Sequence, residues 1–147
     1  MTKDVVTVTP SMEIAAAARV LTERRISGAP VVDAAGVLLG VVSQTDLARF
    51  LGGTSGSEVE GTPVSTVMTL GAVACDEDAD EDDLAELMLR RRVHRILVTS
   101  AGRLCGIVTA MDLLRALLRR SDQNPGAIEG AGRIIARPEF DGNERRL

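Results

Sequence analysis

The stretch GVVSQTDL at residues 40–47 recurs as GIVTAMDL at residues 106–113. In both, a glycine and two β-branched residues predict the end of a strand, and a hydroxyl residue is followed three positions later by aspartate. The repeat extends outward, because Met1-Thr2 returns as Met68-Thr69. Such internal repetition indicates two copies of one structural unit. The predicted organisation is a first motif at 1–51, a linker and lead-in at 52–67, a second motif at 68–118 and a mobile tail at 119–147.

Each copy contains the same order of predicted elements. In the first copy the β-branched residues 5–8 predict a strand, and the apolar positions from Ile14 to Leu21 follow helical spacing. Residues 30–32 and 37–42 predict two strands, and the turn between them is short enough for an antiparallel hairpin. A short helix containing Leu47 follows. The order β-α-β-β-α, read twice, predicts an α/β fold.

The composition argues against several classes of partner. The chain of 147 residues is 45% hydrophobic, carries a net charge of −4 and has only Phe50 and Phe140 as aromatic residues. A nucleic-acid surface is normally basic, and single-strand binders present aromatic platforms, so we expect no nucleic-acid partner. No apolar run reaches the ~18 residues that predict a membrane span. Two cysteines, Cys75 and Cys105, make no disulfide framework, so we expect a cytoplasmic protein with both thiols reduced and packed as small core residues.

The sequence offers little for catalysis or metal binding. It contains one histidine, and no Ser-His-Asp grouping, P-loop or Cys/His metal spacing is present. Residues 76–83 hold seven acids in eight positions, yet an EF-hand needs glycine at its sixth position and glutamate at its twelfth, where this chain has Glu81 and Leu87. The acids are better explained as the first turn of a helix at 84–92, favoured by the helix dipole. We therefore predict no enzyme, no catalytic residue and no metal site.

Four stretches together resemble the CBS (cystathionine beta-synthase-like) motif: residues 26–33 with 40–47, and residues 93–98 with 106–113. The resemblance implies two tandem β-α-β-β-α CBS motifs packed through their sheets about a pseudo-twofold axis. It also implies clefts that bind an adenosine-containing small molecule in many members: AMP, ADP, ATP or S-adenosylmethionine. Members commonly form homodimers, and no cofactor is required. Other members bind magnesium or polynucleotides, and the acidic composition makes these less favoured here.

Ser43 with Asp46, and Thr109 with Asp112, are the first candidate ligand contacts. As structural features they predict capping boxes, in which a hydroxyl and an acid three residues apart satisfy amides at a helix start. The ligand hypothesis is compatible with that role. A carboxylate accepts two hydrogen bonds at once, which suits ribose hydroxyls, and amides at a helix start favour phosphate.

His94 and Arg95 lie where phosphate-binding family members often carry this pair, and a guanidinium offers a planar fork of donors to phosphate. Gly28, Ala29 and Pro30, with Ile96 and Leu97, would line an adenine slot, although we favour a core position for Leu97. The complete predicted ligand set is His94, Arg95, Ile96, Thr109, Met111, Asp112, Gly28, Ala29, Pro30, Ser43, Thr45 and Asp46.

The two copies differ in ways that predict unequal clefts. Residues 62–67 before the second copy resemble the family's lead-in, whereas the first copy begins at Met1 and lacks one, so we expect its cleft to be incomplete at one wall. The first copy also has Ser27-Gly28 where the second has His94-Arg95. We therefore predict one nucleotide cleft, centred on Thr109 and Asp112. The predicted function is a regulatory module that transmits ligand occupancy to an unidentified partner protein; the alternative is a dimerisation or protein-interaction scaffold with empty clefts.

Overall fold

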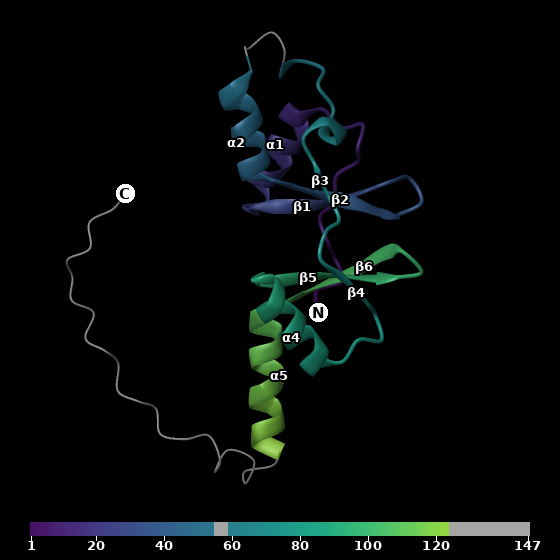
Figure 1. Ribbon diagram of the computed structural model, residues 1–147, viewed down its shortest axis with the longest axis vertical. Helices are drawn as coiled ribbons and strands as arrows, with labels where there is room; N and C mark the ends of the chain where they lie inside the picture. Colours follow the sequence, from purple (N-terminus) through teal and green to yellow (C-terminus); the bar gives the residue numbers. More distant parts are fainter. Residues whose placement is uncertain (55–58, 124–147) are drawn as a thin grey trace, which may run out of the picture. The chain divides into compact units, whose positions relative to one another are not determined.

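The computed structural model describes residues 1–54 and 59–123. The chain divides into one unit at Met1–Leu114 and a second at Arg115–Leu147, whose described part is the continuation of one helix. Residues 55–58 of the predicted linker and 124–147 of the predicted tail lie outside the described residues. The two motifs both belong to the first unit (Figure 1).

The first motif follows the predicted order from its helix onward. It comprises α1 (Ile14–Glu23), β1 (Gly28–Val32), β2 (Leu38–Ser43) and α2 (Gln44–Gly53). The apolar stripe of α1 is buried at Ile14, Ala17 and Leu21, and β1 pairs antiparallel with β2 as a hairpin. These elements are confirmed. The predicted strand at 5–8 is reduced to one parallel bridge between Val8 and Val31.

The second motif repeats this arrangement. Its elements are η1 (Val64–Thr66), β3 (Thr69–Leu70), β4 (Ala74–Asp76), α4 (Glu81–Arg91), β5 (Arg95–Ser100), β6 (Arg103–Thr109) and α5 (Ala110–Gln123). Helix α4 begins three residues before the predicted start because the carboxylate of Asp80 accepts a hydrogen bond from the Asp83 amide at 2.8 Å. Helix α5 extends to Gln123, so residues 119–123 of the predicted tail are helical.

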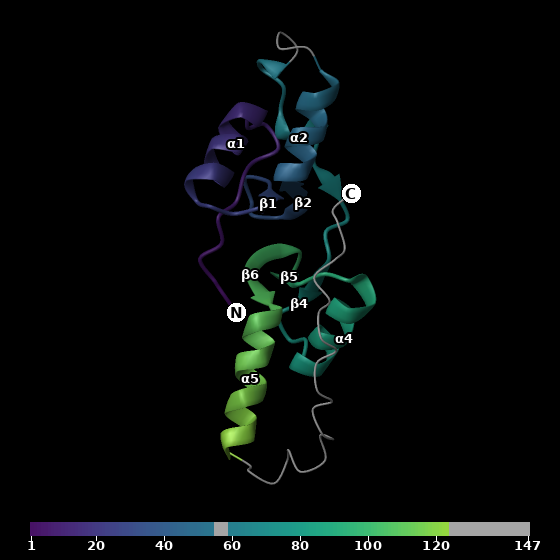
Figure 2. The ribbon, with the colours of Figure 1, turned by 90° about the vertical axis from the view of Figure 1, so that its left-hand side faces the viewer.

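The opening residues of each motif pair with the sheet of the other motif. Strand β3, at the start of the second copy, joins the first motif's hairpin through Gly40 with Leu70 and Val41 with Thr69. Reciprocally, Thr2 pairs with Ile107 of β6 through hydrogen bonds of 2.8 and 2.9 Å. Figure 2 shows these two crossing segments, one purple and one teal, on opposite sides of the paired hairpins. The motifs are therefore joined by exchanged backbone, not by side-chain packing alone.

The turns of the two hairpins are also joined, by equivalent groups. The Leu38 amide donates to the Gly102 carbonyl at 3.1 Å, and the Leu104 amide donates to the Gly36 carbonyl at 3.0 Å. Because each bond repeats the other with the motifs interchanged, the pair has the pseudo-twofold relation that the resemblance implies. This reciprocal contact anchors one end of the space between the sheets.

Each motif has its own aliphatic core between its sheet and its helices. Ile14, Leu21, Val31 and Val42 are among the buried residues of the first core. The second is built from Leu84, Met88, Ile96, Val98 and Val108, with Cys75 and Cys105 packed against it. The strand faces that turn away from these cores are left to line the space between the motifs. Among the helices described, none is long and apolar enough to cross a bilayer.

Candidate functional site

A cleft of about 420 Å³ lies between the two motifs, at the strand ends opposite the joined turns. This volume lies in the usual range of small-molecule sites. The cleft is lined by Ser27, Gly28, Ala29, Pro30, Val41, Val42, Ser43, Thr69, Gly71, Ala72, Val73, Val93, Arg95, Leu97 and Ile107. Both motifs and the exchanged segment between β3 and β4 contribute, so the cleft exists only when the motifs are paired.

Ser43 stands at the junction of β2 and α2, where the predicted capping box is confirmed. The Ser43 hydroxyl accepts from the Asp46 amide at 3.1 Å, and Asp46 Oδ2 accepts from the Ser43 amide at 2.8 Å and from the Ser43 hydroxyl at 2.7 Å. The other carboxylate oxygen, Oδ1, lies 4.0 Å from Arg49 Nη1. The box holds both side chains in one orientation, but only Ser43 lines the cleft, and the predicted contact Asp46 is not part of its lining.

The amides at the start of α2 are less available to an anion than the sequence suggests. The Gln44 amide donates to the Ser27 carbonyl at 2.9 Å, and the Asp46 amide is engaged by the Ser43 hydroxyl. Two of the donors on which the helix-terminus argument rests are thus already used within the protein. The charge for holding a phosphate at this cleft must therefore come mainly from side chains.

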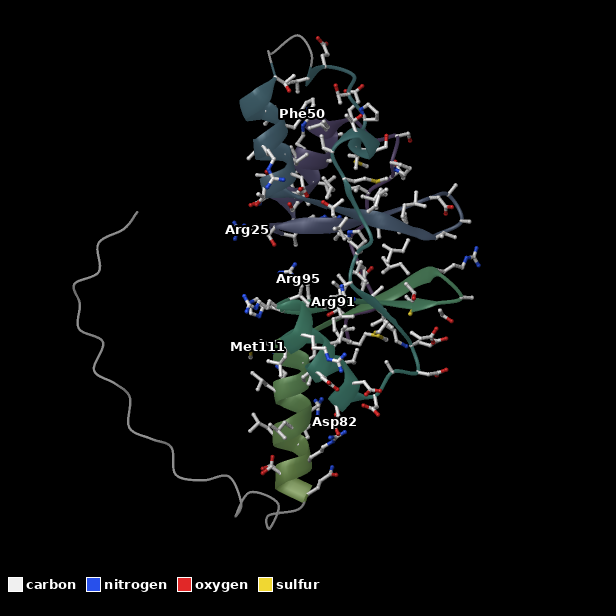
Figure 3. All side chains as sticks on the ribbon, viewed as in Figure 1. Arg25, Phe50, Asp82, Arg91, Arg95 and Met111 are labelled. Carbon is white, nitrogen blue, oxygen red and sulfur yellow. The ribbon has the colours of Figure 1, made fainter. Side chains whose placement is uncertain are left out.

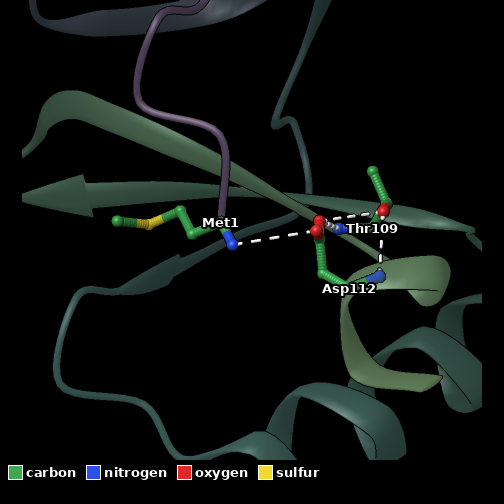
Figure 4. Close-up of polar contacts among 3 residues, drawn as sticks. All are labelled: Met1, Thr109 and Asp112. Carbon is green, nitrogen blue, oxygen red and sulfur yellow. Dashed lines mark hydrogen bonds and ion pairs between the residues drawn. The ribbon is translucent and has the colours of Figure 1, made fainter. Parts of the chain in front are cut away.

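Thr109 and Asp112 form the equivalent box at the start of α5. Asp112 Oδ2 accepts from the Thr109 amide and from the Thr109 hydroxyl, both at 2.9 Å. Here, however, Asp112 Oδ1 faces the amino group of Met1 at 3.8 Å (Figure 4). The side chain of Met1 also lies where a Cβ on Gly106 would be placed. The opening residues of the chain thus lie against the predicted centre of the ligand site.

The exchange of opening segments corrects the predicted asymmetry of the clefts. The cleft of the first copy, at Ser43, was expected to lack one wall because no lead-in precedes that copy. In the structure the wall of that cleft comes from the second copy, through Thr69 and Gly71 to Val73, and Arg95 lines the same cleft. Arg95 is also the ladder partner of Thr109. The cation that we assigned to the Asp112 side therefore belongs to the cleft at Ser43.

The structure also reverses the predicted roles of Ile96 and Leu97. The Ile96 side chain is fully buried in the second core, opposite Val108, whereas Leu97 lines the cleft. Successive side chains of a strand point to opposite faces, so a change of one position interchanges core and cleft. Of the two residues, Leu97 and not Ile96 therefore lines the cleft.

The remaining predicted residues divide into two groups. Gly28, Ala29 and Pro30 line the cleft as predicted, on β1. His94, Thr45 and Met111 are exposed and are not part of that lining. Whether any of them contacts a ligand stays a prediction.

Several lining residues were not among those predicted. Thr69, Gly71 and Ala72 come from the exchanged segment, and Val41 and Ile107 from the hairpins. Gly71 has a φ of 72°, a conformation that glycine adopts readily and that turns the chain from one sheet to the other. The sequence signal for this wall was the Met68-Thr69 repeat, but nothing in it showed which motif the segment would join.

The surroundings of Cys75 disfavour its thiolate form. Burial raises the pKa of the Cys75 thiol, and the neighbouring Asp76 carboxylate and Cys105 raise it further. The Cys105 thiol donates to the Val98 carbonyl at 3.3 Å. Within residues 1–54 and 59–123, no three His, Cys, Asp or Glu side chains gather as a metal-binding group.

A second, smaller cavity lies near the joined turns. Its volume is about 200 Å³, and Lys3, Thr7, Gly36 and Cys105 are among the residues that line it. It is too small for a nucleoside with its phosphates, given that ligand sites begin at about 300 Å³. Of these two cavities, the one at Ser43 and Arg95 is the candidate site.

The fold and the cleft together define a paired α/β module with a ligand-sized space between two pseudo-equivalent halves. Comparison with known families supports the same assignment, since the CBS domain model matches residues 1–53 and 64–119. The chain belongs to the CBS domain family. The resemblance and the fold expected from the sequence are thereby confirmed.

Relatives of known sequence and structure share this module. The chain is 34% identical over 134 residues to inosine-5'-monophosphate dehydrogenase of Methanocaldococcus jannaschii, covering 90% of this chain but only 25% of that enzyme. The crystal structure of CBSX2 of Arabidopsis thaliana in complex with AMP matches with a TM-score of 0.71 and 31% identity, over 82% of this chain and 94% of that one. The CBS domain pair of protein MJ0100, in complex with 5'-methylthioadenosine and S-adenosyl-L-methionine, matches with a TM-score of 0.65 and 26% identity, over 82% and 93%.

Proposed function

We propose that this chain is a regulatory module that binds an adenosine nucleotide in the cleft between its two motifs. The observation that carries the proposal is the meeting of Ser43, Arg95 and the backbone of Gly28–Pro30 in one cleft of about 420 Å³. The cleft combines an apolar interior with a few convergent polar groups, which is the usual character of a small-molecule site. The AMP complex of CBSX2 and the methylthioadenosine and S-adenosylmethionine complexes of MJ0100 support the choice of an adenosine ligand.

The lining suggests how such a ligand would lie. Pro30, Leu97 and Ile107 offer apolar surface to an adenine ring, and the proline leaves no amide to be satisfied there. The ribose hydroxyls would reach Ser43 and the carboxylate of Asp46, which the capping box already orients. Arg95 would hold the first phosphate, because its side chain is exposed at the cleft and a guanidinium binds phosphate oxygens in pairs.

The regulatory effect would follow from the position of the ligand between the motifs. A nucleotide that contacts β1 and α2 of one motif and β5 of the other favours the arrangement in which both sets of contacts are made. Binding to one arrangement alone shifts the population toward it. A partner protein that distinguishes the arrangements would then sense the nucleotide. On this proposal the module acts by binding and has no catalytic activity of its own.

We also propose that the chain forms a homodimer through α5. Met111, Leu114, Leu117 and Leu118 are each more than half exposed, and their spacing places them on one face of the helix. We call this face the apolar stripe. A second copy fits it best, because a stripe on one helix can pack against itself about a twofold axis.

Thermal stability measured with and without ligand tests the nucleotide proposal. Ligand-free protein should melt at a higher temperature with AMP, ADP, ATP or S-adenosylmethionine, on the order of 5–10 °C for a ligand at a hundred times its Kd. Arg95→Ala should weaken AMP by roughly 10–100-fold, the usual loss for a hydrogen bond to a charged group, and leave adenosine unchanged. Arg19→Ala, which removes an exposed arginine of α1, is the control and should change neither.

Two outcomes would count against the proposal. If none of the four ligands raises the melting temperature, the scaffold with empty clefts is the better account. If Arg95→Ala weakens AMP and adenosine equally, Arg95 does not hold the phosphate.

A further inference from the structure

The smaller cavity, near the joined turns, has polar residues at its mouth and apolar residues behind them. Lys3 and Thr7 are exposed, whereas Val5 is half-buried and Val32 is buried. Among the described residues, none lines both this cavity and the nucleotide cleft. Figure 3 shows Arg95, which lines the nucleotide cleft, at the end of the paired sheets away from the hairpin turns. The smaller cavity is therefore a separate place on the molecule.

The polar groups at its mouth are available to a ligand. Lys3 is the only lysine of the chain, and its ammonium makes no ion pair or hydrogen bond with the described residues. Within the same residues, the hydroxyl and the amide of Thr7 have no hydrogen-bond partner. None of the described residues that line the cavity is acidic. An ammonium, a hydroxyl and an amide together offer an anion three kinds of donor.

The internal repeat indicates that the fold does not require these polar side chains. In the second copy Leu70 corresponds to Lys3, and Ala74 corresponds to Thr7. Leu70 lies in β3 and Ala74 in β4, so apolar residues at these positions are compatible with regular pairing of the exchanged segment. The cation and the hydroxyl are thus a difference between the two copies that folding does not explain.

We infer that this cavity binds a short-chain monocarboxylate, whose carboxylate lies at Lys3 and Thr7. The alkyl chain lies against the apolar side chains behind them, those of Val5, Val32 and Leu104. A single cation matches the one charge of a carboxylate, whereas a phosphate dianion would leave a charge unpaired. At about 30 Å³ each, the share of a water molecule in the liquid, the roughly six non-hydrogen atoms of butyrate need about 180 Å³. The cavity of about 200 Å³ provides this space.

A carboxylate in this cavity would hold together three segments that meet at the joined turns. Lys3 and Thr7 belong to the opening segment, Gly36 to the first hairpin and Leu104 to the second. The Leu104 amide already donates to the Gly36 carbonyl at 3.0 Å. Because the ligand would contact all three segments only when the motifs are paired, its binding should stabilise the pair. The inference does not depend on the proposed nucleotide function.

Nuclear magnetic resonance of the full chain, labelled with ¹³C-lysine and ¹⁵N, tests the inference, because Lys3 gives the only lysine signal. We expect this signal and the amides of Val5 and Gly36 to shift saturably during titration with sodium butyrate. Binding should be weak, with a Kd of about 1 mM, because so few atoms contribute little free energy. Sodium chloride at the same ionic strength should give no saturable shift. Inorganic phosphate should bind at least about tenfold more weakly than butyrate.

The informative variant is Lys3→Leu with Thr7→Ala. It introduces the residues that the second copy carries at the equivalent positions, so we expect the fold to be kept. The Gly36 amide should then report butyrate binding at least about tenfold weaker, as expected when hydrogen bonds to a charged group are lost. Arg19→Gln with Thr22→Ala is the matched control, because it removes one exposed cation and one exposed hydroxyl from α1. It should leave butyrate binding unchanged.

Several results would overturn the inference. These are the absence of a saturable shift with butyrate, equal binding of butyrate and phosphate, and equal losses in the variant and the control. Saturating ATP should leave the affinity for butyrate unchanged, because the two cavities have separate linings. Displacement of butyrate by ATP would place both ligands in one cavity and would also contradict the inference. If butyrate binds at Lys3 while no nucleotide binds, the proposed function fails and this inference stands.

Discussion

Gly40→Ala is expected both to destabilise the first motif and to weaken nucleotide binding. A Cβ at Gly40 would lie 2.4 Å from the carbonyl oxygen of Thr69, on the strand that pairs with it. Because the obstacle is backbone, β3 must move away from β2, at a cost of about 1–3 kcal/mol in the free energy of unfolding. The same strand leads into Gly71 and Val73, a wall of the cleft. We therefore expect ATP to bind at least about tenfold more weakly, a loss of about 1.4 kcal/mol.

The equivalent glycine of the second motif provides the control. A Cβ at Gly106 would meet the Sδ of Met1 at 2.6 Å, the end of a flexible side chain, and the Thr2 carbonyl only at 3.1 Å. Methionine rearranges easily, so Gly106→Ala should cost less than about 1 kcal/mol. Urea denaturation and nucleotide titration of both variants measure the difference. Equal damage from the two substitutions would contradict the assigned role of β3.

Leu114→Glu is expected to convert a dimer into a monomer. Leu114 is 52% exposed and lies in the middle of the apolar stripe, where a second copy would cover it. Placing a glutamate there buries two unpaired carboxylates about the twofold axis, which costs several kcal/mol and should weaken the dimer by at least about a hundredfold. Sedimentation equilibrium of the wild-type and variant proteins measures this change.

Leu89→Glu is the matched control for the stripe. Leu89 is an even more exposed leucine, at 79%, but it lies on α4. Its replacement should leave the dimer intact. A wild-type protein that stays monomeric at all concentrations, or a dimer that Leu89→Glu disrupts equally, would show that α5 is not the interface.

Local features of the fold could be predicted because the residues that decide them are close in sequence. The capping boxes depend on contacts three residues apart, at Ser43 with Asp46 and at Thr109 with Asp112. The hairpins and the buried face of α1 likewise follow from short-range periodicity. The repeat then correctly indicated two similar motifs.

The candidate site was harder to predict because it is formed by contacts distant in sequence. The pairing of Thr69 with Val41 exchanges segments between the motifs, and no local pattern encodes it. This exchange completes the wall of the cleft at Ser43, which Arg95 of β5 also lines. The sequence could not show which of Ile96 and Leu97 faces the core and which faces the cleft. Successive residues of this strand are apolar, so no alternation of polar and apolar residues distinguishes its two faces.

Amide chemical shifts of ¹⁵N-labelled, ligand-free protein during titration with ATP test the central claim most directly, because they locate the ligand as well as detect it. We predict saturable shifts that are largest at the backbone amides of the cleft, at Gly28, Ser43, Gly71 and Arg95. Shifts confined to the smaller cavity near Lys3 and Gly36, or no shifts at millimolar ATP, would contradict a nucleotide site between the two CBS motifs.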